Sequence, residues 1–154
     1  MPYRCVTVTH DDHLTLLAAA VIAVAIRLFQ HVRRKRADRV PSVLTPLGFE
    51  RHCAEVLARQ GWRANLTAGS ADQGVDVLAR KGRVSVVIQC KLYSRPVGNA
   101  AVQEVLAGQA FMGATHAAVV SNQTYTRAAR DLAGRTRVLL LSAEDLTRAN
   151  RLFR

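Results

Sequence analysis

Asp76 and the tripeptide Gln89-Cys90-Lys91 are the residues of this chain best suited to chemistry. A carboxylate and an amide oxygen are both ligands of the kind that hard divalent cations take in proteins. An ammonium group beside them can orient a water molecule and offset negative charge that develops during a reaction. Hydrolysis of a phosphodiester needs groups of these kinds. The residues can act together only if they share one face of the fold.

The basic residues of the chain are almost all arginine. There are 22 Lys and Arg against 11 Asp and Glu, a formal net charge of +11. This balance favours an anionic partner, either nucleic acid or an anionic membrane surface, although an arginine-rich proteome would also produce it. Lysine occurs only at positions 35, 81 and 91. An ammonium can shift its pKa when partly buried, whereas a guanidinium cannot, which singles out Lys91.

The three cysteines are Cys5, Cys53 and Cys90, and the five histidines are equally dispersed. Neither set shows a CxxC or Cys/His spacing. This pattern argues against a disulfide scaffold and against a structural zinc site.

Residues 14–32 are predicted to form a single transmembrane helix. Nineteen helical residues span about 28 Å, close to the thickness of a bilayer core. A run of basic residues follows at 33–39 and two acidic residues precede the segment, so the positive-inside rule places the rest of the chain in the cytoplasm. The competing interpretation is a buried or interfacial helix. The predicted organisation is a tail at 1–13, the helix at 14–32, a basic juxtamembrane linker at 33–43 and a domain at 44–154.

The domain is predicted to be α/β. Helices are expected at 45–60, from 98 to about 113, at 124–132 and, in a short form, after a capping box at 142–145. Strands are expected at 62–67, 75–79, 84–91, 116–121 and 138–141, with a hairpin turn at 80–83. The alternation of helices and strands in the second half predicts a parallel section of sheet with helices on its faces.

These elements bring the chemical residues together. Strand alternation over 84–91 places Gln89 and Lys91 on the same face. Antiparallel pairing across the turn would bring Asp76 near them, in a register that the sequence does not fix. In the first helix, helical phase puts Glu50 on the flank of the apolar face, where it can lean over a site, and Glu55 in solvent.

Three segments resemble the Mrr-type catalytic domain of restriction endonucleases, a member of the PD-(D/E)xK nuclease superfamily. They read GFERHCAEVLARQGWRANLT, SADQGVDVLARKG and VVIQCKLYSRPVGNAAVQEVLAGQAFMGATHAAVVSNQTYTRAARDLA. The resemblance runs from about residue 44 to residue 146. It implies a restriction-endonuclease-like mixed sheet flanked by helices, and a magnesium-dependent DNA endonuclease acting in defence or DNA processing.

The resemblance also implies roles for individual residues. Asp76 would be the principal ligand of Mg²⁺ or Mn²⁺, and Gln89 stands where most of the superfamily has a second acid. The backbone carbonyl of Cys90 would be a further ligand, and the carboxylate of Glu50 would complete the metal shell or accept a proton. Lys91 would orient the attacking water or help to deprotonate it. DNA would be the partner, and cleavage of both strands would suggest a homodimer.

Two other functions remain compatible with the sequence. The first is a non-catalytic nucleic-acid-binding module tethered to the membrane. The second is a structural or regulatory membrane protein whose basic face contacts only lipid, which would leave the Asp76, Gln89 and Lys91 set without a purpose.

Overall fold

The computed structural model describes residues 20–27, 45–67 and 74–154. The chain divides into two compact units, Met1–Ala37 and Asp38–Arg154. In the first unit residues 20–27 form a helix whose apolar side chains are exposed. Within the described ranges, no helix is both long enough and apolar enough to cross a bilayer. The remainder of the span predicted at 14–32, together with the tail at 1–13 and the linker at 33–43, lies outside the described residues.

Helix α2 (Pro46–Arg59) begins where the sequence predicts. The Thr45 hydroxyl accepts a hydrogen bond from the Gly48 amide at 3.1 Å, and proline occupies the first turn. The side chains at one helical face, Phe49, Cys53, Val56 and Leu57, are completely buried. Burial of this stripe is what fixes the helix against the sheet.

A five-stranded sheet in the order β1-β2-β3-β4-β5 forms the centre of the domain. The strands are β1 (Arg63–Leu66), β2 (Val77–Lys81), β3 (Val84–Lys91), β4 (His116–Ser121) and β5 (Leu139–Leu141). Strands β1, β2 and β3 pair antiparallel, and β3, β4 and β5 pair parallel. The predicted α/β class with a mixed sheet is therefore confirmed.

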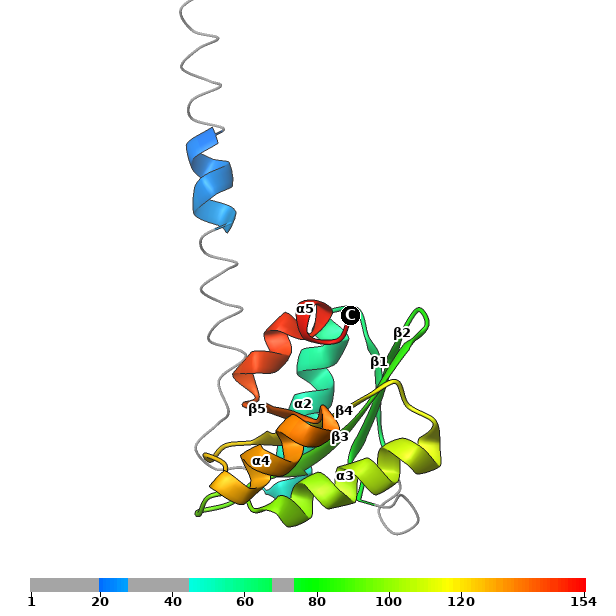
Figure 1. The fold of residues 1–154 in the computed structure, drawn as a ribbon. Coiled ribbons are helices and arrows are strands. Elements are labelled where there is room, and N and C mark those ends of the chain that lie inside the picture. The colour runs from blue at the N-terminus through cyan, green and yellow to red at the C-terminus, as the bar shows by residue number, and fades with distance from the viewer. Residues whose placement is uncertain (1–19, 28–44, 68–73) are drawn as a thin grey trace, which may run out of the picture. The chain divides into compact units, whose positions relative to one another are not determined.

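Helices cover both faces of this sheet (Figure 1). On one face lie α2, the 3-10 helix η1 (Glu144–Arg148) and α5 (Ala149–Leu152). On the other face lie α3 (Asn99–Met112) and α4 (Arg127–Thr136). Each face has its own apolar core, and alternate residues of β3 enter one or the other.

The largest differences from the predicted bounds occur in β2 and α4, each at both of its ends. The hairpin turn is Gly82-Arg83 alone, because Lys81 still pairs with Val84, so β2 extends two residues further than expected. Helix α4 starts at Arg127, three residues later than predicted, because Tyr125 forms a β-bridge with Val97 instead of a helical turn.

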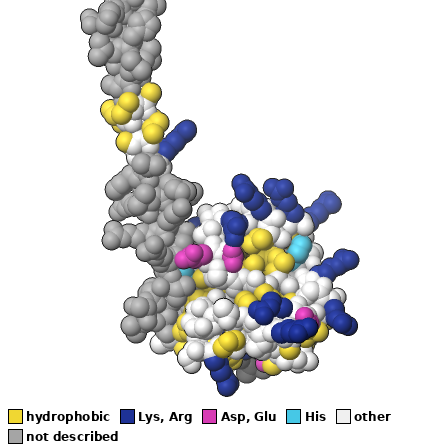
Figure 2. Space-filling model, turned by 60° about the vertical axis from the view of Figure 1, so that its left-hand side comes forward, with side chains coloured by type: hydrophobic (Ala, Val, Ile, Leu, Met, Phe, Trp, Pro, Cys, Tyr) yellow, Lys and Arg dark blue, Asp and Glu magenta, His cyan; other side chains and the backbone are white. Residues whose placement is uncertain are grey.

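Basic side chains stand out on the surface of the domain. Many Lys and Arg side chains and few Asp and Glu side chains project from the face shown in Figure 2. Among the described residues, four ion pairs engage an arginine or a lysine, and three of the four join residues three or four positions apart on a helix. Most of the positive charge on this surface is therefore not neutralised within the domain.

Candidate active site

The β2–β3 register brings Asp76 and Gln89 together. Val77 pairs with Ile88, and the Asp76 amide donates to the Ile88 carbonyl at 2.9 Å, which continues the ladder by one residue. Asp76 therefore lies opposite Gln89, and both side chains point to the face of the sheet that carries Lys91. The shared face that strand alternation predicts is present.

The Asp76 carboxylate is held by two hydrogen bonds at one of its oxygens. Oδ2 accepts from the Gln89 side-chain Nε2 at 2.7 Å and from the Cys90 amide at 2.6 Å. Oδ1 makes no hydrogen bond within the described part of the chain, so it is available to a ligand. Burial raises the pKa of Asp76 to about 6, and the negative charge of Glu50 adds to the increase, although the Cys90 hydrogen bond opposes it.

Gln89, whose Nε2 contacts Asp76, also offers a second side-chain oxygen. Its Oε1 is buried and has no hydrogen-bond partner among the residues that the structure describes. A buried amide oxygen without a partner carries a desolvation cost of about 1–3 kcal/mol, which a bound cation would offset. The chemistry of Asp76 Oδ1 and Gln89 Oε1 therefore fits a hard divalent cation.

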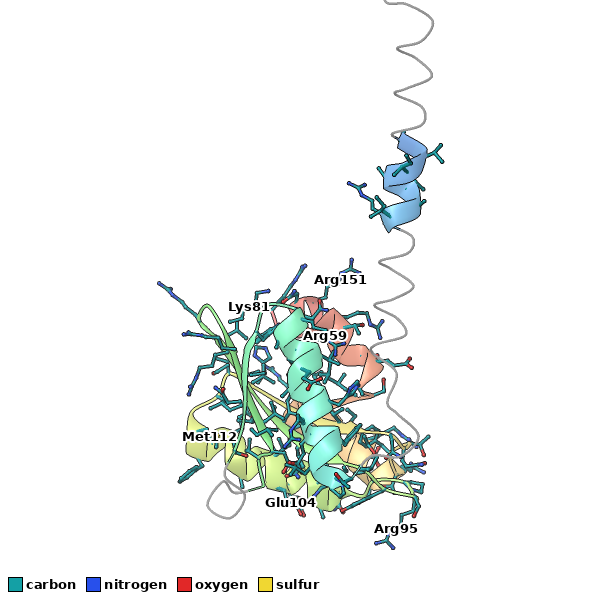
Figure 3. The ribbon with its side chains drawn as sticks, turned by 180° about the vertical axis from the view of Figure 1, so that it is seen from behind. Arg59, Lys81, Arg95, Glu104, Met112 and Arg151 are labelled. Atoms are coloured by element: carbon teal, nitrogen blue, oxygen red, sulfur yellow. The ribbon has the colours of Figure 1, made fainter. Side chains whose placement is uncertain are left out.

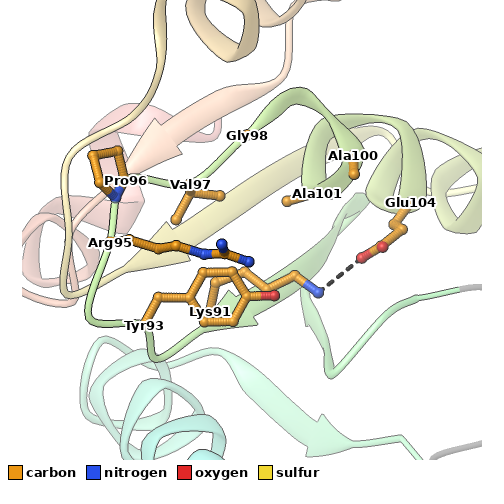
Figure 4. A pocket seen from close by; sticks show the side chains of 9 residues that line it. All are labelled: Lys91, Tyr93, Arg95, Pro96, Val97, Gly98, Ala100, Ala101 and Glu104. Atoms are coloured by element: carbon orange, nitrogen blue, oxygen red, sulfur yellow. Dashed lines mark hydrogen bonds and ion pairs between the residues drawn. The ribbon is translucent and has the colours of Figure 1, made fainter.

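Lys91 is paired with an acid that sequence reasoning missed. Its Nζ lies 2.8 Å from Oε2 of Glu104, a residue of α3 (Figure 4). Burial acts to lower the pKa of Lys91, but the hydrogen bond and charge of Glu104 outweigh it, so the pKa is raised. Lys91 is thus protonated at neutral pH, which favours the predicted role of orienting water over that of accepting its proton.

Glu50 and Cys90 reach the site in different ways. Glu50 is half-buried on α2, and burial raises its pKa. Its negative charge in turn contributes to the raised pKa of Asp76. The Cys90 thiol is buried in the opposite core beside Cys53, so only its backbone faces Asp76. Within the described ranges there is no group of three or more His, Cys, Asp and Glu side chains able to hold a metal ion. The candidate ligands are accordingly one buried acid, one amide and flanking groups.

The restriction endonuclease family, in the form of its Mrr catalytic domain, matches residues 42–149. That range is well over half of the 154 residues. The chain belongs to the restriction endonuclease family. Members of this family are phosphodiester hydrolases, so the domain is of nuclease type. No sequence among the curated proteins matches the chain.

Several solved structures are similar to this chain. A protein of unknown function, AF1548, is 21% identical with a TM-score of 0.52 and is matched over 60% of this chain and 55% of its own. The MspJI restriction endonuclease in complex with a 27-mer oligonucleotide is 19% identical, with a TM-score of 0.46 over 81% of this chain and 30% of its own. The Holliday junction resolvase Hjc of Archaeoglobus fulgidus is 26% identical with a TM-score of 0.41 and is matched over 52% of this chain and 69% of its own. The chain thus spans about half or less of the length of the first two.

A hollow of about 350 Å³ opens beside the candidate site (Figure 4). Lys91, Tyr93, Arg95 and Glu104 line it together with the start of α3. Arg95 and Glu104 lie at the same end of the domain, and Lys81 lies at the opposite end (Figure 3). The hollow beside the candidate site therefore lies at the end of the sheet where β3 finishes.

The backbone at Lys91 and just after it is fixed by side chains at the end of β4. The Ser121 hydroxyl donates to the Lys91 carbonyl at 2.8 Å. The Asn122 amide group accepts from the Tyr93 amide at 2.9 Å and donates to the Tyr93 carbonyl at 3.0 Å. These bonds extend the association of β3 with β4 beyond the last paired residues, so they fix the backbone at and after Lys91 on the side of β4.

The Thr126 side chain has a structural role as the N-cap of α4. Its hydroxyl accepts from the Ala129 amide at 3.2 Å, which is ordinary helix capping. The Tyr125 hydroxyl lies within hydrogen-bond distance of the Val119 and Leu141 carbonyls, at 2.9 and 2.8 Å, and so bridges β4 and β5. Asp72, which precedes the site in the sequence, lies outside the described residues.

Proposed function

We propose that this protein is a metal-dependent DNA endonuclease, with Asp76, Gln89, Lys91 and Glu50 as the residues of its active site. One observation supports this function above all. In a domain of the restriction endonuclease family, a free carboxylate oxygen, an unpartnered buried amide oxygen and a protonated ammonium come together at one end of β3. Those are the groups that hydrolysis of a phosphodiester requires.

Each residue has a distinct task in this proposal. Asp76 Oδ1 and Gln89 Oε1 would hold a divalent cation, with the Cys90 carbonyl and Glu50 as further oxygen donors. A bound Mg²⁺ or Mn²⁺ would supply Lewis acidity at the phosphate and lower the pKa of a coordinated water. Lys91 donates hydrogen bonds to the water or to the phosphate oxygens, and Glu104 keeps it oriented and charged. Because Gln89 adds no charge, we expect weak affinity for the metal.

The proposal is tested by cleavage of plasmid DNA in Mg²⁺ with the full-length protein. Wild type should nick or linearise the plasmid, and Lys91→Ala should slow cleavage by a factor of about 10² to 10⁴, because a positioned charge is removed from the reacting phosphate. Arg135→Ala removes one positive charge from the exposed surface of α4 and should cut like wild type. Equal rates for wild type and Lys91→Ala would refute the site assignment.

The same assay separates catalysis from binding. A non-catalytic nucleic-acid-binding module would retain DNA in a gel-shift experiment, and it would cut no plasmid in either Mg²⁺ or Mn²⁺. We expect cleavage, because a carboxylate with a raised pKa next to a residue with an unpartnered amide oxygen is typical of a catalytic site, and binding alone does not require it.

We also propose that residues 14–32 anchor the nuclease domain to the membrane, with the domain in the cytoplasm. This proposal rests on the length and apolarity of the segment and on the basic run after it. In fractionation of cell lysates without detergent, the full chain should sediment with membranes and a chain of residues 41–154 should remain in the supernatant. The same distribution for both would remove the anchor.

A further inference from the structure

Arg63 and Arg80 face each other across β1 and β2. The two residues are register partners on neighbouring antiparallel strands, and both side chains are exposed. With Asn65 and Leu78 they line a hollow of about 180 Å³. Neither arginine forms an ion pair within the described residues. Like charges directly opposite each other destabilise a strand pair, so a bound anion would stabilise this arrangement.

The arginine pair shares a face with the active site. Side chains alternate along β2, so Arg80 and Leu78 point to the same face as Asp76, which precedes the strand. Arg80 lies four residues from Asp76, which corresponds to about 13 Å along the strand at 3.3 Å per residue. A ligand bound at Asp76 and lying along β2 therefore reaches the arginine pair.

Among the described residues, no helix packs extensively on this face of β1 and β2. Helix α3 packs on β3 and β4, and α4 packs on α3 and β5. Helix α2 covers the opposite face of the same strands, where Ala64, Leu66, Val77 and Ala79 join its core. An extended anion can thus lie on the arginine side without displacing a helix.

We propose that the Arg63–Arg80 face binds the backbone phosphates of duplex DNA about four base pairs from the cut. This inference rests on the proposed nuclease function. A duplex rises about 3.4 Å per base pair, so the 13 Å between Asp76 and Arg80 corresponds to roughly four steps. A guanidinium matches a phosphate through two parallel hydrogen bonds, and such contacts fix the position of the duplex without reading its sequence.

The double variant Arg63→Gln/Arg80→Gln tests the proposal. Binding of the full-length protein to a fluorescently labelled 30-base-pair duplex is measured by anisotropy in EDTA, where no cleavage occurs. Each phosphate contact contributes about 0.9 to the slope of log K against log salt concentration, so the slope should fall in magnitude by about 1.8. Affinity near 0.1 M salt should fall roughly tenfold or more. The slope should be largely retained in Arg63→Lys/Arg80→Lys, which keeps both charges.

The matched control is Arg127→Gln/Arg135→Gln. It removes the same charge from exposed positions of α4, on the part of the sheet furthest from β1. It should change the slope by less than half as much, because general attraction at a distance is screened by salt. An equal loss of slope in both double variants, or no loss in Arg63→Gln/Arg80→Gln, would overturn the proposal.

Duplex length gives a second, independent readout. The difference between wild type and Arg63→Gln/Arg80→Gln should disappear on duplexes that end fewer than about four base pairs beyond the cut, because no phosphate then reaches the pair. A difference that persists on such duplexes contradicts the placement. These results are distinct from a failure of the proposed function, which would appear as absent cleavage in Mg²⁺ and Mn²⁺ while the salt dependence of binding still reports on the arginine pair.

Discussion

Asp76→Asn should abolish cleavage and at the same time stabilise the folded protein at pH 8. Loss of the carboxylate removes the principal metal ligand, so cleavage in Mg²⁺ should fall at least about a thousandfold. The asparagine side chain can still accept the hydrogen bonds from Gln89 and the Cys90 amide, so the local structure is kept. The plasmid assay and thermal unfolding in EDTA measure the two effects.

The expected gain in stability follows from the pKa of Asp76, which burial raises from 3.8 to about 6. Between these two values the folded protein holds a proton that the unfolded chain has released, so this group adds stability as the pH falls through about 6. Above about pH 6 the Asp76 carboxylate of the folded protein is charged, and the full free-energy cost of burying that charge lowers the stability of the fold. The stability difference between Asp76→Asn and wild type should therefore be largest at pH 8 and shrink toward pH 4.

Two comparisons test whether these effects come from the Asp76 carboxylate. Mg²⁺ should raise the unfolding temperature of wild type and leave that of Asp76→Asn unchanged, because a ligand stabilises only the protein that binds it. Asp131→Asn, at an exposed position of α4, should show neither the loss of cleavage nor the dependence on pH. An Asp76→Asn protein that is less stable than wild type at pH 8 would contradict the assignment of a costly buried carboxylate.

Gly74→Ala should lower both stability and activity. Gly74 has a φ of +78°, and an added Cβ would lie 2.8 Å from Cβ of Glu104 and 3.0 Å from Oε1 of Gln89. The first of these atoms is fixed to α3 and cannot rotate away. Backbone strain and overpacking should together cost about 2–4 kcal/mol in the free energy of unfolding, measured by urea titration.

The effect on cleavage should exceed the loss of folded protein. The added methyl group presses on Gln89 and on the residue that holds Lys91, so the remaining folded molecules should cut at least tenfold more slowly. Gly134→Ala is the control, because nothing lies within 4 Å of its added Cβ and the residue is inside α4. That change should stabilise the protein by about 0.5–1 kcal/mol and leave cleavage unaltered. Wild-type stability and cleavage in Gly74→Ala would contradict the close packing at this glycine.

Strand alternation predicted the shared face of the site although the predicted turn was too long. A turn at residues 80–83 would pair Ala79 with Val84, whereas the structure pairs Lys81 with Val84. The two registers differ by two residues, and because side chains repeat with a period of two, Asp76 keeps its face in either one. The direct contact with Gln89 follows only from the observed register. The period of two fixes the face on which a side chain lies but not the residue opposite it, so the sequence alone does not identify Gln89 as the partner of Asp76.

Glu104 could not be identified from the sequence in the same way. Its contact with Lys91 depends on how α3 lies across the end of β3 after the crossover to β4, which is a matter of tertiary packing. The only available signal was that Glu104 is the sole acidic residue of α3. The buried state of Gln89 Oε1 and the height of the Asp76 pKa are likewise properties of packing, and no local pattern encodes them.

The two-residue turn at Gly82-Arg83 has a consequence for the order in which the chain can fold. Asp76, Gln89 and Lys91 belong to one hairpin, whose closure confines only a short loop and carries a small entropy cost. Parallel pairing of β3 with β4 must instead enclose the whole of α3, so it depends on contacts of much greater sequence separation. Asp76, Gln89 and Lys91 therefore lie on the most local pairing of the sheet, whereas Glu50, the fourth residue proposed for catalysis, reaches the site through the packing of α2 on the sheet.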